Sequence, residues 1–356
     1  MRVSIIGVGL IGGSVGLAAR ERLGAEVTGW DPSPGVLDAA CAHGALDRGA
    51  ASLEEAVAAA QAVFVAAPVG ALPETIAAVL AAAGGDCVVT DVGSTKRSVV
   101  AAVDDPRFVG GHPLAGAETA GVAHARADLF QEATWYLTPT ATTTGELLER
   151  LHRLLRGLGA KPTVIDAATH DTMLAAVSHL PHAIANVLVA QAARALEDES
   201  EQLPATGPSF RDATRVAGAN SGIWTDIYLA NRDALIERID DAARRLQEFR
   251  ALLVAADADG VTAWNEAARA DRRRLLEAQL AGGTVHELRV SVPNEPGVVA
   301  RLALELGRAG VNINDMALYP APNQAEGVVA LWIAGDEPAQ RAERLVEEQG
   351  FPVARA

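Results

Sequence analysis

Residues 1–14 read MRVSIIGVGLIGGS, and this stretch decides the fold. A short apolar run at residues 2–6 is followed by glycines at Gly7, Gly9 and Gly12. The pattern predicts a buried strand, a tight turn and the start of a helix. Gly7 would permit the turn, Gly9 would let the backbone approach a pyrophosphate, and Gly12 would allow close packing of helix on strand. The free N–H groups and positive dipole end of that helix would face the phosphates.

A second apolar run, residues 26–30, ends at Asp31. A carboxylate at this place can accept hydrogen bonds from a ribose diol and would repel a 2′-phosphate, so the predicted cofactor is NAD rather than NADP. In the alternative reading the glycines serve only the turn and Asp31 only caps a helix. We also expect Leu10, Ile11 and Pro68 to contact the cofactor.

Composition limits the classes of function. At roughly 150 residues per domain, 356 residues predict two or three domains. The net charge of −15 argues against nucleic acid or an anionic membrane surface as a partner. Cys41 and Cys87 are too few for a disulfide framework or a structural zinc site, and no metal is expected; this indicates a reducing, cytoplasmic location. Residues 1–6 are interpreted as strand rather than signal peptide, and no apolar run is expected to span a bilayer.

Three segments are expected along the chain. From 1 to 166, short β-branched runs alternate with alanine-rich stretches, which predicts an α/β domain with a Rossmann-type, doubly wound parallel sheet. Its further strands are expected at residues 62–67, 87–91, 108–111, 135–138 and 162–165, with a helix at 146–158. From 167 to 281, strand signals nearly vanish and long helices are expected at 173–196 and 232–254. This helical domain would bind substrate and bury apolar positions against a second subunit, giving a homodimer.

The third segment, 284–356, follows the break at Gly282-Gly283. Its pattern predicts a small α+β domain of β-α-β-β-α-β order, as in ferredoxin-like folds. The strands are expected at 288–292, 311–318, 328–333 and near 351, and the helices at 296–309 and 338–348.

Two polar clusters point to chemistry. The first is GHPLAGAE at residues 111–118, and the second is FRDATR at 210–215 followed by IWTD at 223–226. The first supplies a histidine that can take a proton, at the end of a predicted strand on the carboxyl edge of the sheet. The second supplies guanidinium groups that can hold carboxylates. With the glycine loop they predict a dehydrogenase for a small, multiply anionic substrate.

The third segment resembles the ACT domain, a regulatory module that binds small amino acids, typically between copies. The resemblance is carried by VPNEPG at 292–297 and GVNIND at 310–315. It implies that Asn294, Gly297 and Asn312 contact an effector, with tyrosine the probable one. The alternative is a ferredoxin-like domain that only dimerises.

The rest of the chain resembles prephenate dehydrogenase, the family that includes arogenate and cyclohexadienyl dehydrogenases. Four stretches carry the resemblance: DVGSTK at 91–96, the cluster around His112, SHLPH at 178–182, and residues 215–226. It implies NAD-dependent oxidative decarboxylation of prephenate to 4-hydroxyphenylpyruvate in tyrosine biosynthesis. The chain departs from the family pattern at 207–209 and 221–223, which leaves fine selectivity, and the choice between prephenate and arogenate, open.

By resemblance, His112 contacts the substrate hydroxyl, and Ser94 bridges nicotinamide, substrate and His112. Capping of a helix is the alternative for Ser94. Arg215 is the candidate carboxylate clamp, because a planar guanidinium matches a carboxylate in two parallel hydrogen bonds; a surface salt bridge is its alternative. Arg211 is expected to support Asp212 or Asp226.

Other residues are placed beside the substrate by the same resemblance. Lys96 is expected to balance substrate or cofactor charge, or else to be a solvated helix residue. Glu118 and Thr119 are expected to fix a loop or gate access. The remaining expected contacts are Ser178, His179, His182 and Trp224.

Two rival functions remain open from sequence. A β-hydroxyacid dehydrogenase would need a catalytic lysine on the helical domain, and residues 167–202 contain none. A sensor that keeps the fold without turnover is the other rival, and the presence of both His112 and Arg215 argues against it.

Overall fold

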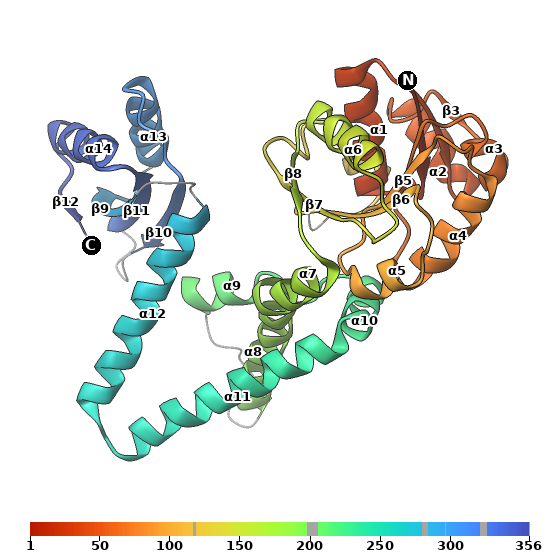
Figure 1. Cartoon of the computed structure of the whole chain (residues 1–356). Helices are drawn as coiled ribbons and strands as arrows, with labels where there is room; N and C mark the ends of the chain where they lie inside the picture. Colours follow the sequence, from red (N-terminus) through yellow and green to blue (C-terminus); the bar gives the residue numbers. More distant parts are fainter. Residues whose placement is uncertain (117–118, 198–205, 280–283, 296, 321–325, 356) are drawn as a thin grey trace. The chain divides into compact units, whose positions relative to one another are not determined.

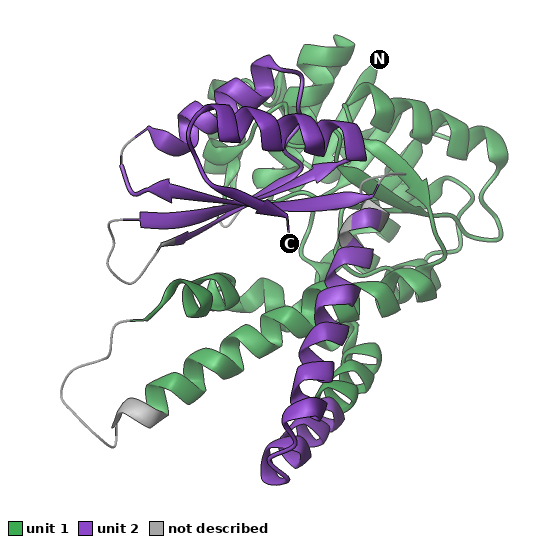
Figure 2. Cartoon of the chain, turned by 90° about the vertical axis from the view of Figure 1, so that its left-hand side faces the viewer, with its two compact units in different colours: residues 1–242 green, residues 243–356 purple. Residues whose placement is uncertain are grey.

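The structure is a computed structural model that describes residues 1–116, 119–197, 206–279, 284–295, 297–320 and 326–355. The chain forms two compact units, Met1–Ala242 and Ala243–Ala356 (Figure 2). The finer division at 166 and 281 stays a prediction.

The first unit is built on an eight-stranded sheet of order β3-β2-β1-β4-β5-β6-β7-β8 (Figure 1). All neighbouring strands are parallel except β6 and β7, which pair antiparallel. This confirms the Rossmann-like sheet and adds one correction, because the sheet is mixed rather than wholly parallel. Between β6 and β7 the described chain has only a short 3₁₀ turn, and without a crossover helix the next strand can return antiparallel. The strands are β1 (Arg2–Ile6), β2 (Glu26–Trp30), β3 (Arg48–Gly49), β4 (Ala62–Val65), β5 (Val88–Asp91), β6 (Phe108–Pro113), β7 (Thr134–Thr138) and β8 (Lys161–Val164).

Helices cover both faces of this sheet, each over its own apolar core. Figure 1 shows α1 and α6 on one side and α3 and α4 on the other. The first core includes Val15 and Leu151, and the second includes Val57 and Ile76. The helices are α1 (Leu10–Leu23), α2 (Pro34–Ala42), α3 (Leu53–Val57), α4 (Leu72–Ala82), α5 (Arg97–Ala101) and α6 (Gly145–Gly157), with 3₁₀ turns η1 (Val69–Ala71) and η2 (Val122–His124).

The glycine loop is shaped by packing at two of its three glycines. Gly7 has φ +90°, and a Cβ there would lie 2.6 Å from the carbonyl oxygen of Ala66. At Gly12 a Cβ would lie 2.1 Å from the carbonyl oxygen of Gly7. Around Gly9 a Cβ would meet no heavy atom within 4 Å. The first and third glycines are therefore required by the fold, whereas the space at Gly9 is available to a ligand.

Helices follow the sheet, as predicted, and the described residues between 167 and 279 contain no strand. One turn departs from α geometry: Ala175–His179 is a π-helix between α7 and α8, just before Pro181. The elements are α7 (Ala167–Leu174), α8 (Leu180–Glu197), α9 (Pro208–Thr214), α10 (Ser221–Ala230), α11 (Arg232–Val254) and α12 (Ala258–Gln279).

The expectation that no segment is long and apolar enough to cross a membrane is wrong. Residues 167–194 form a continuous helical run with a window of mean hydropathy 1.5, of which 22% is buried within this chain. The same run carries His170 and Asp171, which are fully buried within the first unit. Its exposed apolar side chains include Val177, Val187 and Val189.

The second unit contains a four-stranded antiparallel sheet of order β10-β11-β9-β12. The order β-α-β-β-α-β matches the expectation, although β10 begins at Asp315, four residues later than expected. Helices α13 and α14 cover one face of the sheet over a core that includes Leu288, Leu302 and Val346 (Figure 2). The elements are β9 (Val285–Pro293), α13 (Val298–Arg308), β10 (Asp315–Pro320), β11 (Glu326–Ala334), α14 (Asp336–Glu348) and β12 (Val353–Arg355).

Gly12→Ala should lower the free energy of unfolding by about 1–3 kcal/mol, because the added methyl group overlaps the Gly7 carbonyl. Gly9→Ala is the matched control, since its methyl group meets open space and its φ of −88° suits alanine. The comparison is made by urea unfolding. Equal losses in the two variants would contradict the packing role assigned to Gly12.

Candidate active site

His112 lies near the end of β6 and is 7% exposed. The carboxylate of Asp91, at the end of the neighbouring strand β5, fixes the backbone around it. This carboxylate accepts the backbone N–H of Gly111 at 3.0 Å and that of Gly93 at 2.8 Å. Two strand ends are thus joined by one buried carboxylate directly beside the histidine.

Lys96 is fully buried, and its ammonium group is bonded to the Asp91 carboxylate. Burial lowers the Lys96 pKa, while the attraction of Asp91 opposes that shift. The alternative that Lys96 is a solvated helix residue is therefore wrong. Its ammonium group is paired with Asp91 across the loop that follows β5.

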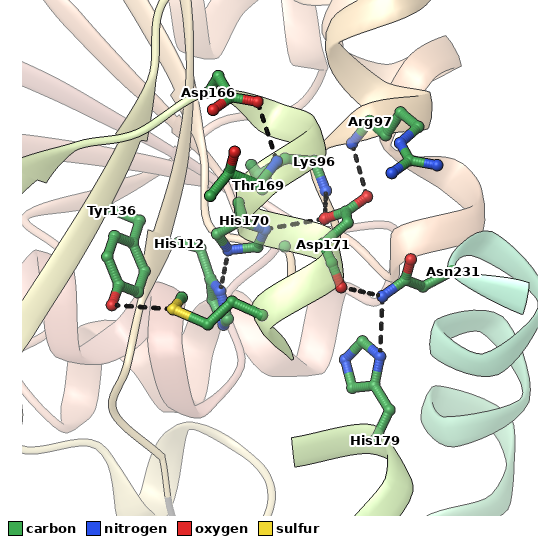
Figure 3. Close-up of polar contacts among 12 residues, drawn as sticks. Lys96, Arg97, His112, Tyr136, Asp166, Thr169, His170, Asp171, His179 and Asn231 are labelled. Atoms are coloured by element: carbon green, nitrogen blue, oxygen red, sulfur yellow. Dashed lines mark hydrogen bonds and ion pairs between the residues drawn. The ribbon is translucent and has the colours of Figure 1, made fainter. Parts of the chain in front are cut away.

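A chain of buried hydrogen bonds leads from His112 into the helical segment (Figure 3). Nδ1 of His112 lies 2.9 Å from Nε2 of His170, and Nδ1 of His170 lies 2.8 Å from Oδ1 of Asp171. The Asp171 carboxylate also accepts the backbone N–H groups of Lys96, at 2.8 Å, and Arg97, at 2.9 Å. Burial raises the Asp171 pKa, but the bonds from His170 and these two N–H groups outweigh it and lower the pKa overall.

A third buried histidine, His179, lies at the end of the π turn. Its Nδ1 is 3.1 Å from Nδ2 of Asn231, which also donates to the backbone carbonyl of Asp171 at 2.7 Å (Figure 3). Its other ring nitrogen is buried and has no hydrogen-bond partner among the described residues.

His112 and His179 are both held neutral. The His112 pKa is lowered well below its usual value by burial, and further by His170, Lys96 and His179. Burial lowers the His179 pKa to about 4, against the attraction of Asp171. Each imidazole therefore has one unprotonated ring nitrogen at physiological pH, and proton acceptance at His112 requires such a nitrogen.

A pocket of about 910 Å³ is lined by Ala115 and Gly116, which follow His112 closely in the chain, and by Ser178, which precedes His179. Among the described residues, the two histidines themselves do not line it. Of the expected substrate residues, it is lined by Thr119, Ser178, His182, Arg215 and Trp224. The His182 ring stacks on Trp224 with centroids 3.5 Å apart, and Arg215 contributes, after burial, to lowering the His182 pKa. The pocket thus combines a guanidinium with an aromatic wall, which suits an anionic ring compound. Glu118 lies outside the described residues.

The dinucleotide residues fit the predicted cofactor. Helix α1 begins after Gly9 without a side-chain cap, and its first turn carries no acidic residue, so its N–H groups are available to phosphates. Asp31 stands at the end of β2, where Oδ2 accepts the Val8 N–H at 3.0 Å and so ties the carboxylate to the glycine loop. Leu10 and Ile11 begin α1, and Pro68 is exposed after β4.

Ser94 is half-buried in the loop after β5 and caps no helix, because α5 begins after Lys96. The capping alternative is therefore wrong. Asp226 accepts the Gly70 N–H at 3.3 Å, which ties α10 to the loop after β4; the described bonds pair it with Gly70 rather than with Arg211.

The expected effector residues are not gathered in one copy of the chain. Asn294 follows the end of β9 that pairs with Glu326, whereas Asn312 precedes the end of β10 that pairs with Trp332. These are opposite ends of the small sheet. Asn294, Gly297 and Asn312 are all exposed.

Sequence reasoning missed His170, Asp171 and Asn231. Asp166 caps the helix by accepting the Thr169 N–H, and a His-Asp pair in the next turn was the available signal. A histidine followed by an aspartate is common on solvated helices, so burial could not be read from it. Asn231 gave no signal.

Comparisons with known proteins agree with this site. Residues 15–164 match the family "Prephenate dehydrogenase, nucleotide-binding domain", and residues 166–266 match "Prephenate dehydrogenase, dimerization domain". The prephenate dehydrogenase of Bacillus subtilis is 32% identical, over 97% of this chain and 95% of that protein.

Two solved structures are similar as well. One is prephenate dehydrogenase from A. aeolicus in complex with hydroxyphenyl propionate and NAD+, with a TM-score of 0.73 and 28% identity, covering 77% of this chain and 98% of that one. The other is Synechocystis arogenate dehydrogenase, with a TM-score of 0.66 and 26% identity, covering 77% of this chain and all of that one.

His179 should titrate near pH 4 in the folded protein, because its charged form is disfavoured by burial. Since an unfolded histidine titrates near pH ~6.5, the unfolded state binds the proton first, and His179 should reduce stability as pH falls from 6.5 toward 4. Histidine NMR titration measures this, with His179→Asn assigning the signal. A midpoint near 6.5 would show that the ring is solvated.

Proposed function

This chain belongs to the prephenate dehydrogenase family and is an NAD-dependent enzyme, and we propose that its substrate is prephenate. The membership sets aside the β-hydroxyacid dehydrogenase and sensor alternatives. The observation that carries the proposal is a neutral, buried His112 on the strand that leads to Ala115 and Gly116, which line a pocket together with Arg215. The product is 4-hydroxyphenylpyruvate, with CO₂ and NADH.

The chemistry needs a temporary proton acceptor. NAD bound at the glycine loop would supply the acceptor for the hydride that leaves the carbinol carbon of the ring. His112 accepts the hydroxyl proton, and the ring becomes aromatic as the carboxylate on the opposite carbon leaves as CO₂. The electrons of the broken C–C bond pass into the ring and onto the oxygen, which takes its proton back from His112. No proton is released overall, so a histidine buried away from bulk water suffices.

The pocket supplies the binding. Prephenate carries two carboxylates, and Arg215 is the guanidinium that lines the pocket beside His182 and Trp224. A bidentate pair with a carboxylate would hold the ring in register with His112. Arogenate differs by an ammonium group in the side chain and is the second candidate, because one similar structure is an arogenate dehydrogenase.

The chain is proposed to be a cytoplasmic homodimer, and the exposed apolar side chains of α8 and α11 support the dimer. Val187 is 57% exposed and Ile236 is 54% exposed, on helices within the segment matched by the dimerization-domain family. Side chains of this kind are expected to be covered by a second copy.

Tyrosine is proposed as a feedback inhibitor that binds the C-terminal sheet as an ACT domain. The β-α-β-β-α-β order and the left-handed Gly297 at the start of α13 support this assignment. Because Asn294 and Asn312 lie at opposite ends of the sheet, the effector site would be completed between two copies.

Purified protein with NAD and prephenate should form NADH at 340 nm, and faster than with arogenate. His112→Asn should lower kcat by about 10²–10⁴-fold, because a proton acceptor is lost, while NAD affinity persists. Arg215→Gln should mainly raise KM. Turnover of arogenate alone would transfer the assignment to that substrate, and an unchanged KM in Arg215→Gln would remove the clamp role.

Tyrosine should inhibit the full-length enzyme, and Asn294→Ala or Asn312→Ala should weaken inhibition by roughly tenfold, the equivalent of one lost hydrogen bond. The measurement is the half-inhibitory tyrosine concentration, with uninhibited turnover recorded alongside. Equal inhibition of all three proteins, competitive with substrate, would move the effector to the active site.

A further inference from the structure

Three buried polar residues surround His112 and His179 and have no role in the proposed reaction so far. His170 lies against His112, Asn231 lies against His179, and Asp171 is bonded to both His170 and Asn231. His170 and Asp171 are fully buried, and Asn231 is 4% exposed. The partners of these residues fix which of their atoms donate and which accept hydrogen bonds. That in turn decides which ring nitrogen of His112 and of His179 carries the hydrogen.

The first limit comes from Asp171. Its carboxylate accepts two backbone N–H groups and has a lowered pKa, so it carries no hydrogen to donate. Nδ1 of His170, 2.8 Å away, must therefore carry the hydrogen of that bond. A neutral ring protonated at Nδ1 has its lone pair at Nε2.

That lone pair faces His112. Nδ1 of His112, 2.9 Å from Nε2 of His170, donates the hydrogen between the two rings. Because His112 is neutral, its own Nε2 then holds a lone pair. His112 is thus oriented as a proton acceptor through Nε2.

The second limit comes from Asn231 and has the opposite effect. The atom of Asn231 that lies 2.7 Å from the Asp171 carbonyl must be its amide nitrogen, because a carbonyl only accepts. The same nitrogen lies 3.1 Å from Nδ1 of His179, which therefore accepts. A neutral His179 then carries its hydrogen on Nε2, the buried atom without a partner among the described residues.

We propose that His170 and Asn231 are positioning residues that fix the two histidines in opposite tautomers, so that His112 accepts a hydrogen through Nε2 and His179 donates one. The proposal deepens the proposed function and rests on it for its purpose. The substrate hydroxyl would donate to His112, and an oxygen of the anionic substrate would accept from His179. One site would thereby hold a donor and an acceptor made from the same residue type.

The direct test does not depend on any substrate. Long-range ¹H–¹⁵N NMR of the full-length protein labelled in histidine, near pH 7.5, distinguishes protonated from unprotonated ring nitrogens. His112 should be protonated only at Nδ1, and His179 only at Nε2. A hydrogen on Nε2 of His112, on Nδ1 of His179, or on both nitrogens of His170 would overturn the proposal. Because no turnover is involved, this outcome is independent of whether prephenate is the substrate.

A matched pair of variants tests the effect on the reaction. His170→Gln can place an acceptor oxygen near the Nε2 position, whereas His170→Leu cannot. His170→Leu should lower kcat by about 10²–10⁴-fold with KM little changed, and His170→Gln should recover most of the loss. Equal loss in both would reduce His170 to a packing role and overturn the proposal. NAD binding checks that each variant is folded, and if His170→Leu does not fold, the NMR measurement on the native chain still decides.

A third variant should reverse the tautomer of His179. Asn231→Asp replaces an amide donor by a carboxylate of the same shape, so Nδ1 of His179 should become protonated and Nε2 should lose its hydrogen. The ¹⁵N signals of His179 should exchange character while those of His112 stay unchanged. Unaltered His179 signals would show that Asn231 does not set its tautomer.

Discussion

The active site depends on one buried carboxylate, that of Asp171. It accepts the backbone N–H groups of Lys96 and Arg97 and the ring hydrogen of His170, while the carbonyl of the same residue accepts from Asn231. Hydrogen bonds to a charged group contribute about 1.5–3 kcal/mol each, and leaving such a group unpaired in the interior costs more. Asp171 therefore joins the loop after β5, helix α7 and the start of α11. Its partners His170 and Asn231 in turn contact His112 and His179, the two histidines of the candidate site.

Asp91, at the end of β5, is a second buried carboxylate that binds backbone N–H groups near His112. It joins the ends of β5 and β6 through Gly93 and Gly111, and it neutralises the buried Lys96. A pair of buried carboxylates thus binds the backbone on both sides of His112, in a chain whose net charge is −15. The excess of negative charge is no obstacle locally, because these carboxylates are fully used by N–H groups and one ammonium. The guanidinium of Arg215 lines the pocket and contributes positive charge there.

The sequence predicted the parts of this architecture that repeat locally. Seven of the eight strands of the large sheet and the small domain's order of elements follow from alternating β-branched and alanine-rich stretches. The two-residue β3, Arg48–Gly49, was not predicted, because so short a strand has no hydrophobic period of its own. The direction of β7 was not predicted, because no local pattern distinguishes a parallel from an antiparallel return. His112 and Arg215 were found by motif, whereas His170 and Asn231 were not, since their roles depend on contacts across 58 and 52 positions with His112 and His179. The burial of Lys96 was likewise hidden, because a lysine after a loop is usually solvated.

The π turn at Ala175–His179 has a consequence for how this site can change during evolution. A π turn holds one residue more than the α-helix would, and it rotates the helix on its N-terminal side relative to the helix on its C-terminal side. His179, at its end, meets Asn231, while His182, in the regular helix beyond, stacks on Trp224. The relative orientation of these two rings therefore depends on the number of residues between Leu174 and Leu180. Deletion of the codon for Ala176 or Val177 would retain His179 and His182 and still misdirect one of the two rings.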